Sequence, residues 1–201
     1  MPSLQLRPYR PADLLALYDI CLRTGASGED ASSMYRHPML LGHQYVAPYA
    51  TLCPEYTFVL EDGQRVQGYV VGVPDSADFA RRCEAEWFPL LRGLYPLPEA
   101  EDRSPDAAII CRLHRGIPAP GGSWGPQYPA HLHIDLLPAA QGGGHGRRLM
   151  VTLFGRLREG GAAGVHLGVG RSNVRAQGFY GRLGFTVLEE DEGGLTLGLT
   201  L

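Results

Sequence analysis

The sequence predicts an α/β fold in which helices cover both faces of a β-sheet. The last third of the chain alternates between β-type and helical segments in the order β-α-β-α-β-β, which is typical of such a fold. Two β-type runs flank Asp62-Gly63, a dipeptide that favours a hairpin turn. With 201 residues, 44% of them hydrophobic, the chain is long enough to bury a sizeable core, and we expect a single domain over residues 1–201.

In the first two thirds, predicted elements alternate with stiff, proline-rich loops. All 16 prolines lie at or before Pro138, whereas 16 of the 27 glycines follow it. Helices are predicted where apolar residues recur at helical spacing, and strands where β-branched and aromatic residues cluster. The predicted elements are a strand over 4–8, a helix over 11–22, an irregular and partly helical stretch over 25–55, strands over 56–61 and 66–73, helices over 78–91 and 105–114, and a long loop over 117–129.

The last third is expected to hold uninterrupted elements joined by tight turns. No polar linker accompanies the change in composition at Pro138, so this position is not a domain boundary. The predicted elements are a strand over 130–137, a helix over 144–158, a strand over 165–169, a helix over 173–183 and two closing strands between 185 and 199.

The charged residues exclude several classes of function. All 18 basic residues are arginines, and 21 acidic residues give a formal net charge of −3. A dedicated nucleic-acid-binding protein would normally show a basic domain or stripe, so we expect no nucleic-acid partner. Because the chain has no lysine, neither a P-loop nor a lysine Schiff base is possible.

The location of the protein is predicted from its N-terminus, its apolar segments and its cysteines. Residues 1–7 lack the basic and apolar regions of a secretory signal, and the longest uncharged stretch, 38–54, contains three prolines. The four cysteines form no C-x-x-C pair and lie beside apolar neighbours, as reduced core cysteines do. We therefore expect a cytoplasmic protein with no membrane partner. No pattern in the sequence specifies an oligomeric state.

The stretch Gln141-Gly-Gly-Gly-His-Gly-Arg-Arg is the most informative motif. It lies between a predicted strand and a predicted helix, where glycines let a ligand approach the backbone and free amides attract a phosphate. Arg147 and Arg148 add positive charge at the same place. A dinucleotide fingerprint fails because position 147 is not glycine, and a Walker A loop fails because there is no lysine. The alternative is a flexible loop without a ligand.

Two motifs of the last third carry a resemblance to a known family. Gln141, Gly144 and Gly146 match the pattern Q/R-x-x-G-x-G/A, and the pattern N-x-x-A-x-x-F-Y-x-x-x-G-F follows, beginning at Asn173. Over about residues 130–186 the chain resembles the GCN5-related N-acetyltransferases (GNAT). The resemblance implies a mixed, mostly antiparallel sheet that is flanked by helices and splayed between its two central strands.

The first two thirds are similar to the acetyltransferase-like domain at the C-terminal end of O-GlcNAcases and to its free-standing bacterial relatives. The similar stretches are Ile20-Cys-Leu-Arg-Thr-Gly, Leu41-Gly-His, Glu84-x-Glu-Trp-Phe-Pro and Pro129-Ala-His-Leu-His-Ile-Asp-Leu-Leu-Pro. This resemblance leaves a second function open, because some of these relatives are suspected of lacking transferase activity. The second function is a catalytically inactive module that binds acetyl-CoA and acts through protein contacts.

The resemblance implies an acetyl-CoA site within residues 130–186, with acceptor-side elements over about 1–129. The backbone of Leu136 and Leu137 would pair with the pantetheine arm. Asn173 would contact coenzyme A or cap its own helix. The amides of residues 142–147 would hold the pyrophosphate, and Arg147 and Arg148 would touch phosphate. The loop residues expected to bind the cofactor are Gln141, Gly142, Gly143, Gly144, His145, Gly146, Arg147 and Arg148.

Acetyl transfer to an amine needs an acid for the departing thiolate and a base for the acceptor. Tyr180 matches the position at which the family places the acid; its alternative reading is a core aromatic residue. Asp135 is the candidate base, because it is a lone acid in an apolar strand and burial would raise its pKa. The alternatives are a purely structural role for Asp135, with a water chain or Glu86 as the base.

The acceptor is expected to be a small-molecule amine or an amine of a protein or peptide. The loops over 25–55 and 117–129 are the expected acceptor wall, since the cofactor half is already accounted for. The side chains expected there are Tyr45, Tyr49, Trp124, Tyr128 and His133.

His131, His133 and Asp135 are spaced so that all three point to one face of their strand. They therefore also form a plausible ligand set for a metal-dependent hydrolase. The usual scaffold for such an H-x-H motif is an eight-stranded barrel of about 250 residues, and a metal site leaves the glycine loop unexplained. We expect no metal, and we expect the two histidines to line the acceptor pocket or to share hydrogen bonds with Asp135.

Overall fold

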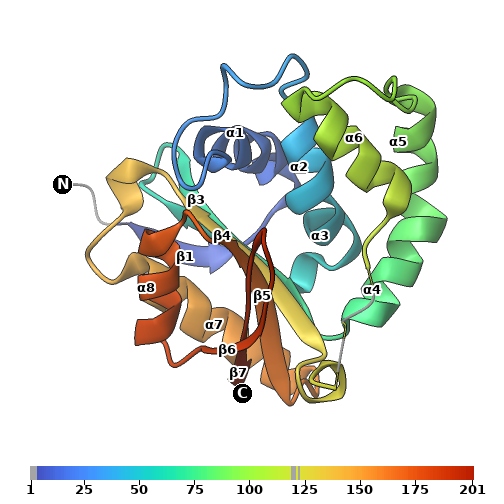
Figure 1. The fold of residues 1–201 in the computed structure, drawn as a ribbon. Coiled ribbons are helices and arrows are strands. Elements are labelled where there is room, and N and C mark those ends of the chain that lie inside the picture. The colour runs from blue at the N-terminus through green and yellow to red at the C-terminus, as the bar shows by residue number, and fades with distance from the viewer. Residues whose placement is uncertain (1–3, 119–120, 122) are drawn as a thin grey trace.

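The computed structural model describes residues 4–118, 121 and 123–201, and shows a seven-stranded sheet with helices on both faces (Figure 1). The strands lie in the order β1-β2-β3-β4-β5-β7-β6. Within the described residues, β4 and β5 are parallel and all other neighbouring pairs are antiparallel. The predicted fold class, a mixed and mostly antiparallel sheet flanked by helices, is confirmed. The strands are β1 Gln5–Pro8, β2 Thr57–Glu61, β3 Val66–Val73, β4 Ala130–Leu136, β5 Gly164–Gly170, β6 Thr186–Glu190 and β7 Gly194–Thr200.

The helices agree closely with the ranges expected from apolar spacing. The segment over 25–55, predicted to be irregular and partly helical, contains two short helices. The helices are α1 Leu14–Thr24, α2 Leu40–Tyr45, α3 Ala47–Leu52, α4 Ser76–Arg82, α5 Phe88–Leu94, α6 Pro105–Arg115, α7 His145–Glu159 and α8 Val174–Arg182. No helix in the described part of the chain is long and apolar enough to cross a membrane.

One predicted helix, over 78–91, is interrupted. A π-helical turn over Cys83–Trp87 separates α4 from α5, and the amide of Phe88 donates to the carbonyl of Cys83. Pro89 in the first turn of α5 has no N–H and cannot continue the hydrogen-bond ladder of α4. The wider turn accommodates this missing donor.

Helices α1 and α7 pack against opposite faces of the sheet. A side chain at Gly72 of β3 would meet Leu153 of α7 at 3.0 Å. Tyr69 of the same strand instead lies near Cys21 of α1. Because successive strand residues alternate between faces, positions 69 and 72 lie on opposite sides. The register of β3 against β4 then places His131, His133 and Asp135 on the α1 face, so the prediction that they share a face is confirmed.

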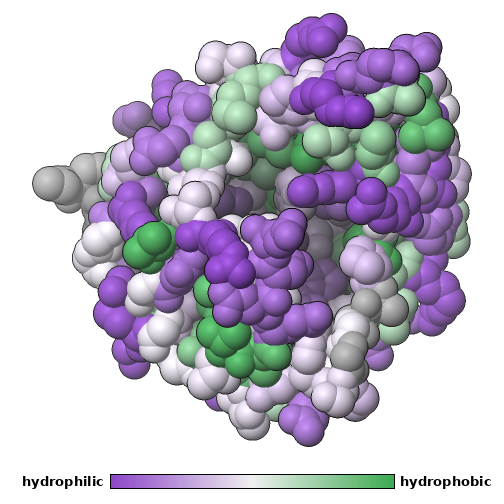
Figure 2. All heavy atoms as spheres, in the orientation of Figure 1, coloured by the Kyte–Doolittle hydropathy of each residue, from purple (hydrophilic) through white to green (hydrophobic). Residues whose placement is uncertain are grey.

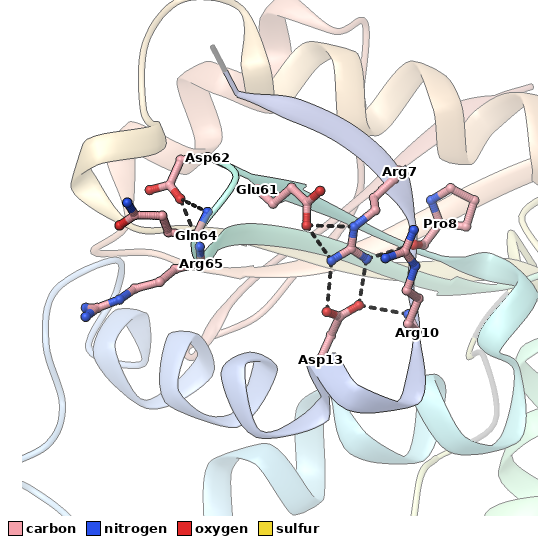
Figure 3. A network of polar contacts seen from close by, with 8 residues as sticks. All are labelled: Arg7, Pro8, Arg10, Asp13, Glu61, Asp62, Gln64 and Arg65. Carbon is pink, nitrogen blue, oxygen red and sulfur yellow. Dashed lines mark hydrogen bonds and ion pairs between the residues drawn. The ribbon is translucent and has the colours of Figure 1, made fainter. Parts of the chain in front are cut away.

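Arg7 of β1 forms hydrogen bonds and ion pairs that connect the N-terminal strand to the rest of the fold (Figure 3). Its guanidinium donates to the carboxylate of Asp13 at 2.7 and 2.9 Å and to that of Glu61 at 2.6 and 2.8 Å. The amide of Arg10 also donates to Asp13, at 2.8 Å. The Arg7 charge holds the pKa of Asp13 below its usual value. This network ties β1 to β2 and to the turn that opens α1.

Candidate active site

The two central strands separate soon after they begin. In the described structure β4 and β5 pair at Ala130 with Val165 and at His131 with His166, and at no later position. On its other side β4 stays paired with β3 up to Leu136. The splay implied by the family resemblance is therefore present.

Backbone groups of β4 line the resulting gap. Hydrogen bonds of an antiparallel pair alternate along the strand, and the amide of Leu137 donates to the carbonyl of Gln67. The groups of Ile134 and Leu136 consequently face away from β3, into the splay. The carbonyl of Leu137 accepts from the amide of Ala140. The expectation that Leu137 pairs with the pantetheine arm is therefore corrected: both of its backbone groups are already bonded within the chain.

A cavity of about 1240 Å³ occupies the splay; we call it the large cavity. Its lining comes from α1, α6, β4, the glycine loop before α7, β5 and α8. Figure 2 shows a hollow near the middle of this face, bordered by hydrophilic side chains. The expected cofactor residues that line the large cavity are Leu136, Gln141, Gly142, Gly143, Gly144, Gly146, Arg147 and Asn173.

The glycine loop needs glycine for its backbone shape. Gly142, Gly143 and Gly144 have φ of 80°, 57° and 77°, in the left-handed region that other residues rarely adopt. Within the described chain their amides donate to no other residue. Three unpaired amides beside the start of α7 form a concave donor surface suited to an anion.

Gly146 and Gln141 fix the loop against α8. A Cβ at Gly146 would meet the ring of Phe179 at 3.2 Å, so glycine there allows α7 and α8 to approach closely. The amide nitrogen of Gln141 donates to the carbonyl of Leu136 at 2.9 Å, and its amide oxygen accepts from Arg175. The Gln141 side chain thus holds the loop, the end of β4 and α8 together.

Of the two arginines expected to meet phosphate, only Arg147 lines the large cavity in the described structure. Arg148 points elsewhere and approaches the carbonyl of Leu4 at 3.4 Å. Neighbouring residues of a helix point about 100° apart, so the two arginines leave α7 in different directions. A contact of Arg148 with phosphate stays a prediction. Arg175, which sequence reasoning missed, lines the cavity instead.

Two further expectations about the cofactor half have mixed outcomes. His145 does not belong to the lining of the large cavity, and its ring lies 3.0 Å from where a Gly143 Cβ would be. Asn173 caps α8, because its side-chain oxygen accepts from the amide of Ala176 at 3.0 Å. Asn173 also lines the cavity, so the cap does not prevent contact with a ligand.

Asp135 lies in the wall of the large cavity, on β4. The hydroxyl of Tyr69, on β3, donates to its carboxylate at 2.5 Å. Burial raises the pKa of Asp135 above its usual value, and the Tyr69 bond partly opposes that rise because it stabilises the charged form. Asp135 is therefore a carboxylate with raised proton affinity. Sequence reasoning missed Tyr69, since no local motif reveals which residue of a neighbouring strand lies opposite.

Tyr180 of α8 lines the same cavity and is only 8% exposed. Burial, and to a smaller degree the charge of Asp135, raise the pKa of the Tyr180 phenol above its usual value, so the phenol stays protonated near neutral pH. Within the described residues its hydroxyl has no hydrogen-bond partner. A protonated and unpaired phenol in the same cavity wall as a carboxylate can donate to a developing negative charge.

A second, smaller cavity of about 190 Å³ adjoins the first; we call it the small cavity. Tyr45 and His133 line both cavities. The small cavity reaches β5 at His166. Its lining residues are Gln44, Tyr45, Tyr49, Ser76, Ile117, Pro118, His131, His133 and His166.

A chain of hydrogen bonds fixes which nitrogen of each histidine carries the proton. The Ser76 hydroxyl donates to the carbonyl of Pro129 at 2.6 Å, so it accepts from Nδ1 of His131 at 2.7 Å. Nε2 of His131 then accepts from the Tyr49 hydroxyl at 2.7 Å. Because this uses the single Tyr49 hydrogen, Nε2 of His133 donates to the Tyr49 oxygen at 3.1 Å. This assignment leaves Nδ1 of His133 with a lone pair.

Burial keeps these rings neutral. It lowers the pKa of His131 well below its usual value and that of His133 to about 4. The two rings bond to Tyr49 rather than to Asp135, so the expectation of shared bonds with Asp135 is corrected. Both nitrogens of His131 are already used, which argues against His131 as a metal ligand. No group of three or more His, Cys, Asp or Glu side chains in the described chain could hold a metal ion.

Three other candidates lie outside the two cavities. The indole nitrogen of Trp124 donates to Glu189 at 3.1 Å, and its ring packs on His166 from outside the small cavity. Tyr128 touches this region through its carbonyl, which accepts from His166. Glu86 pairs with Arg82 at 3.4 Å on an exposed helix face. Trp124, Tyr128 and Glu86 are thus not among the described lining residues of either cavity, whereas Tyr45 and Tyr49 do line the small cavity.

The chain has the features of a transferase that uses an acyl-CoA. These features are the splayed sheet, the glycine loop at a helix start and the tyrosine on the following helix. Comparison with family models matches residues 29–185 to the acetyltransferase (GNAT) family, to which the chain belongs. Acetyl-CoA is the co-substrate of this family.

The chain is also related to the acetyltransferase-like domain of O-GlcNAcases. It is 25% identical over 189 residues to protein O-GlcNAcase of Rattus norvegicus, and the match covers 94% of this chain but 20% of that protein. The chain thus spans about a fifth of the length of this curated relative.

Among solved structures, the crystal structure of a protein named SsHAT is 42% identical, with a TM-score of 0.89 and coverage of 99% of this chain and 98% of that one. The PaiA N-acetyltransferase of Thermoplasma acidophilum in complex with coenzyme A is 13% identical, with a TM-score of 0.56 and 99% coverage of both chains. The second likeness shows the shared fold alone.

Proposed function

We propose that the protein transfers an acetyl group from acetyl-CoA to an amine by direct attack within a ternary complex. The observation that carries this proposal is the shared wall of the large cavity, where Asp135 and Tyr180 lie beside the glycine loop. The family supplies the reaction type, and the cavity wall includes a carboxylate that can accept a proton, Asp135, and a phenol that can donate one, Tyr180. We expect the acceptor to be a small-molecule amine or an amine of a peptide or protein.

The residues present fit acetyl-CoA. The unpaired amides of Gly142, Gly143 and Gly144, with Arg147 beside them, suit the pyrophosphate. The backbone amide of Leu136 faces the splay and suits a carbonyl of the pantetheine arm, whereas the Leu136 carbonyl already accepts from Gln141. When bound, acetyl-CoA would supply the activated acetyl thioester.

In the proposed reaction Asp135 accepts the proton that the amine loses, either directly or through water. A raised pKa brings the proton affinity of its carboxylate closer to that of a base working near neutral pH. Tyr180 donates its phenolic hydrogen bond to the departing thiolate, and burial strengthens that bond by excluding water. Tyr69 orients Asp135 through the bond at 2.5 Å.

A second candidate function is a module that binds acetyl-CoA without catalysis and acts through protein contacts. It is supported by the similarity to a segment of a much longer protein, protein O-GlcNAcase, whose name denotes a different activity. Both candidates bind the cofactor, so binding does not separate them. We also propose a cytoplasmic location, which the four free cysteines support.

Thiol release from acetyl-CoA in the presence of an amine panel tests the proposal. We expect release with the wild type and a fall of about 10²-fold or more in Tyr180→Phe, the range of a general acid. Tyr128→Phe is the matched control, because Tyr128 lines neither cavity, and it should retain the wild-type rate. Calorimetry with coenzyme A confirms that both variants are folded and loaded.

Two outcomes contradict the proposal in different ways. Absence of release with every amine, while coenzyme A still binds, favours the non-catalytic module. Equal rates for the wild type and Tyr180→Phe remove Tyr180 from the role of acid.

A further inference from the structure

The small cavity offers lone pairs to a ligand. Nδ1 of His133 is an acceptor by the bond assignment above, and no described residue donates to it. Nδ1 of His166 lies 2.8 Å from the carbonyl of Tyr128, which can only accept, so this nitrogen carries the proton. Nε2 of His166 is therefore also an acceptor.

The small cavity is also uncharged. Its described lining contains no acid and no arginine, and burial lowers the pKa of both His133 and His166. Arg112 brings a positive charge to the border of the small cavity, because Arg112 donates to the hydroxyl of Tyr45 from the side of the large cavity. The carboxylate of Asp135 belongs to the wall of the large cavity, so an ammonium group inside the small cavity would lose its water without finding a carboxylate in the described lining, and a carboxylate would meet only lone pairs.

The shape of the small cavity favours a flat molecule. Tyr45 and Tyr49 contribute aromatic rings to its wall, and Ile117 and Pro118 contribute apolar surface. Cavities of about 150 Å³ hold a benzene ring, so 190 Å³ accommodates a ring with a small substituent. Offset or edge contacts with the two tyrosine rings would favour an aromatic ligand over an aliphatic one.

We infer that the small cavity is the acceptor subsite and that it selects a small, uncharged aromatic amine whose N–H is accepted by Nδ1 of His133. Because Tyr45 and His133 line both cavities, an amine at His133 with its ring in the small cavity faces the large one. An aromatic amine is neutral near pH 7, so its nitrogen lone pair is available without prior loss of a proton. The link to acetyl transfer rests on the proposed function, whereas the binding itself does not.

Binding of three probes of similar shape to the coenzyme A-loaded protein tests the inference. Aniline is a neutral donor, benzylammonium a cation and benzoate an anion. We expect NMR titration to show saturable binding of aniline and at least tenfold weaker binding of the other two. His133→Phe keeps a ring but removes the acceptor, and it should weaken aniline binding by about tenfold, as the loss of one buried hydrogen bond does. His37→Gln is the matched control, because His37 is exposed and lines neither cavity.

Retained coenzyme A binding shows that each variant is folded. If His133→Phe fails this check, Tyr49→Phe replaces it. Without the Tyr49 oxygen, His133 can carry its proton on either nitrogen, so Nδ1 is an acceptor only part of the time and aniline binding should weaken. The inference is overturned if aniline does not bind, if all three probes bind equally, or if the folded variant binds aniline as the wild type does. Thiol release with alkylamines but no aniline binding would keep the proposed function and reject this subsite. Aniline binding without any thiol release would do the reverse.

Discussion

At the scale of single residues, Tyr49 determines how the histidine pair presents its nitrogens. Its one hydroxyl lies between Nε2 of His131 and Nε2 of His133. Long-range ¹⁵N–¹H NMR should therefore find His131 protonated on Nδ1 and His133 on Nε2 at neutral pH. Tyr49→Phe should leave His131 bonded to Ser76 but allow both tautomers of His133. The opposite tautomer of His133 in the wild type would contradict the bond assignment.

Asp135 should determine the acid limb of activity. Since burial raises its pKa, kcat/KM is expected to rise with pH at values above those usual for a carboxyl group. Tyr69→Phe removes a hydrogen bond that favours the charged form, so the pKa of Asp135 rises further and this limb moves to higher pH. Rate measurements across pH with both proteins check the direction. A limb that stays in place in Tyr69→Phe would show that Asp135 is not the titrating base.

Some of the predicted site residues contact partners that are far away in the sequence. The indole nitrogen of Trp124 donates to Glu189, and Arg148, although it lies on helix α7, approaches the carbonyl of Leu4. Tyr180, Asp135 and the loop glycines lie within or beside regular elements, so their directions follow from helix or strand geometry. The candidate site was therefore predictable where local periodicity orients a side chain.

At the scale of elements, glycine is favourable in the glycine loop and unfavourable inside helix α7. Gly144 has φ of 77°, so alanine there should lower the free energy of unfolding by about 1 kcal/mol and weaken coenzyme A binding. Gly155 lies inside α7 and has open space at its Cβ position, so alanine there should raise stability by about 1 kcal/mol. Urea unfolding of both variants, with calorimetry of coenzyme A binding, measures the contrast. Equal effects of the two substitutions would show that loop geometry is not limiting.

The order and type of the elements could be predicted from the sequence because each has its own apolar period or turn signal. The hairpin at Asp62-Gly63 and the stripe of α7 are examples. The π-helical turn over Cys83–Trp87 was not predicted, since Pro89 can kink, end or displace a helix and the sequence does not show which. The apposition of α3 to β4, which brings Tyr49 to the histidines, depends on contacts between residues 82 and 84 positions apart.

At the scale of the whole molecule, the buried histidines should make the protein sensitive to acid. The folded pKa of His133, about 4, lies below the usual 6.5, so the unfolded state binds more protons between these values. The contribution of neutral His133 to the free energy of unfolding is fully present above pH 6.5. It is lost as the pH falls toward 4, by up to about 3 kcal/mol. Urea unfolding at pH 7 and pH 4.5 should show a smaller loss for His133→Phe than for the wild type. Parallel losses would show that other groups control acid unfolding.

The separation of β4 from β5 after two residue pairs gives the sheet an internal edge. Unpaired strand edges recruit other strands, and proteins normally shield them at the rim of a sheet. Here the backbone of Ile134 and the amide of Leu136 face the splay in the middle of the sheet, where a bound pantetheine arm would pair with them. A ligand at a hundred times its Kd stabilises a fold by about 2.7 kcal/mol. The supply of acetyl-CoA in the cell would then affect turnover. It would also set the fraction of the protein that is empty and able to aggregate through this edge.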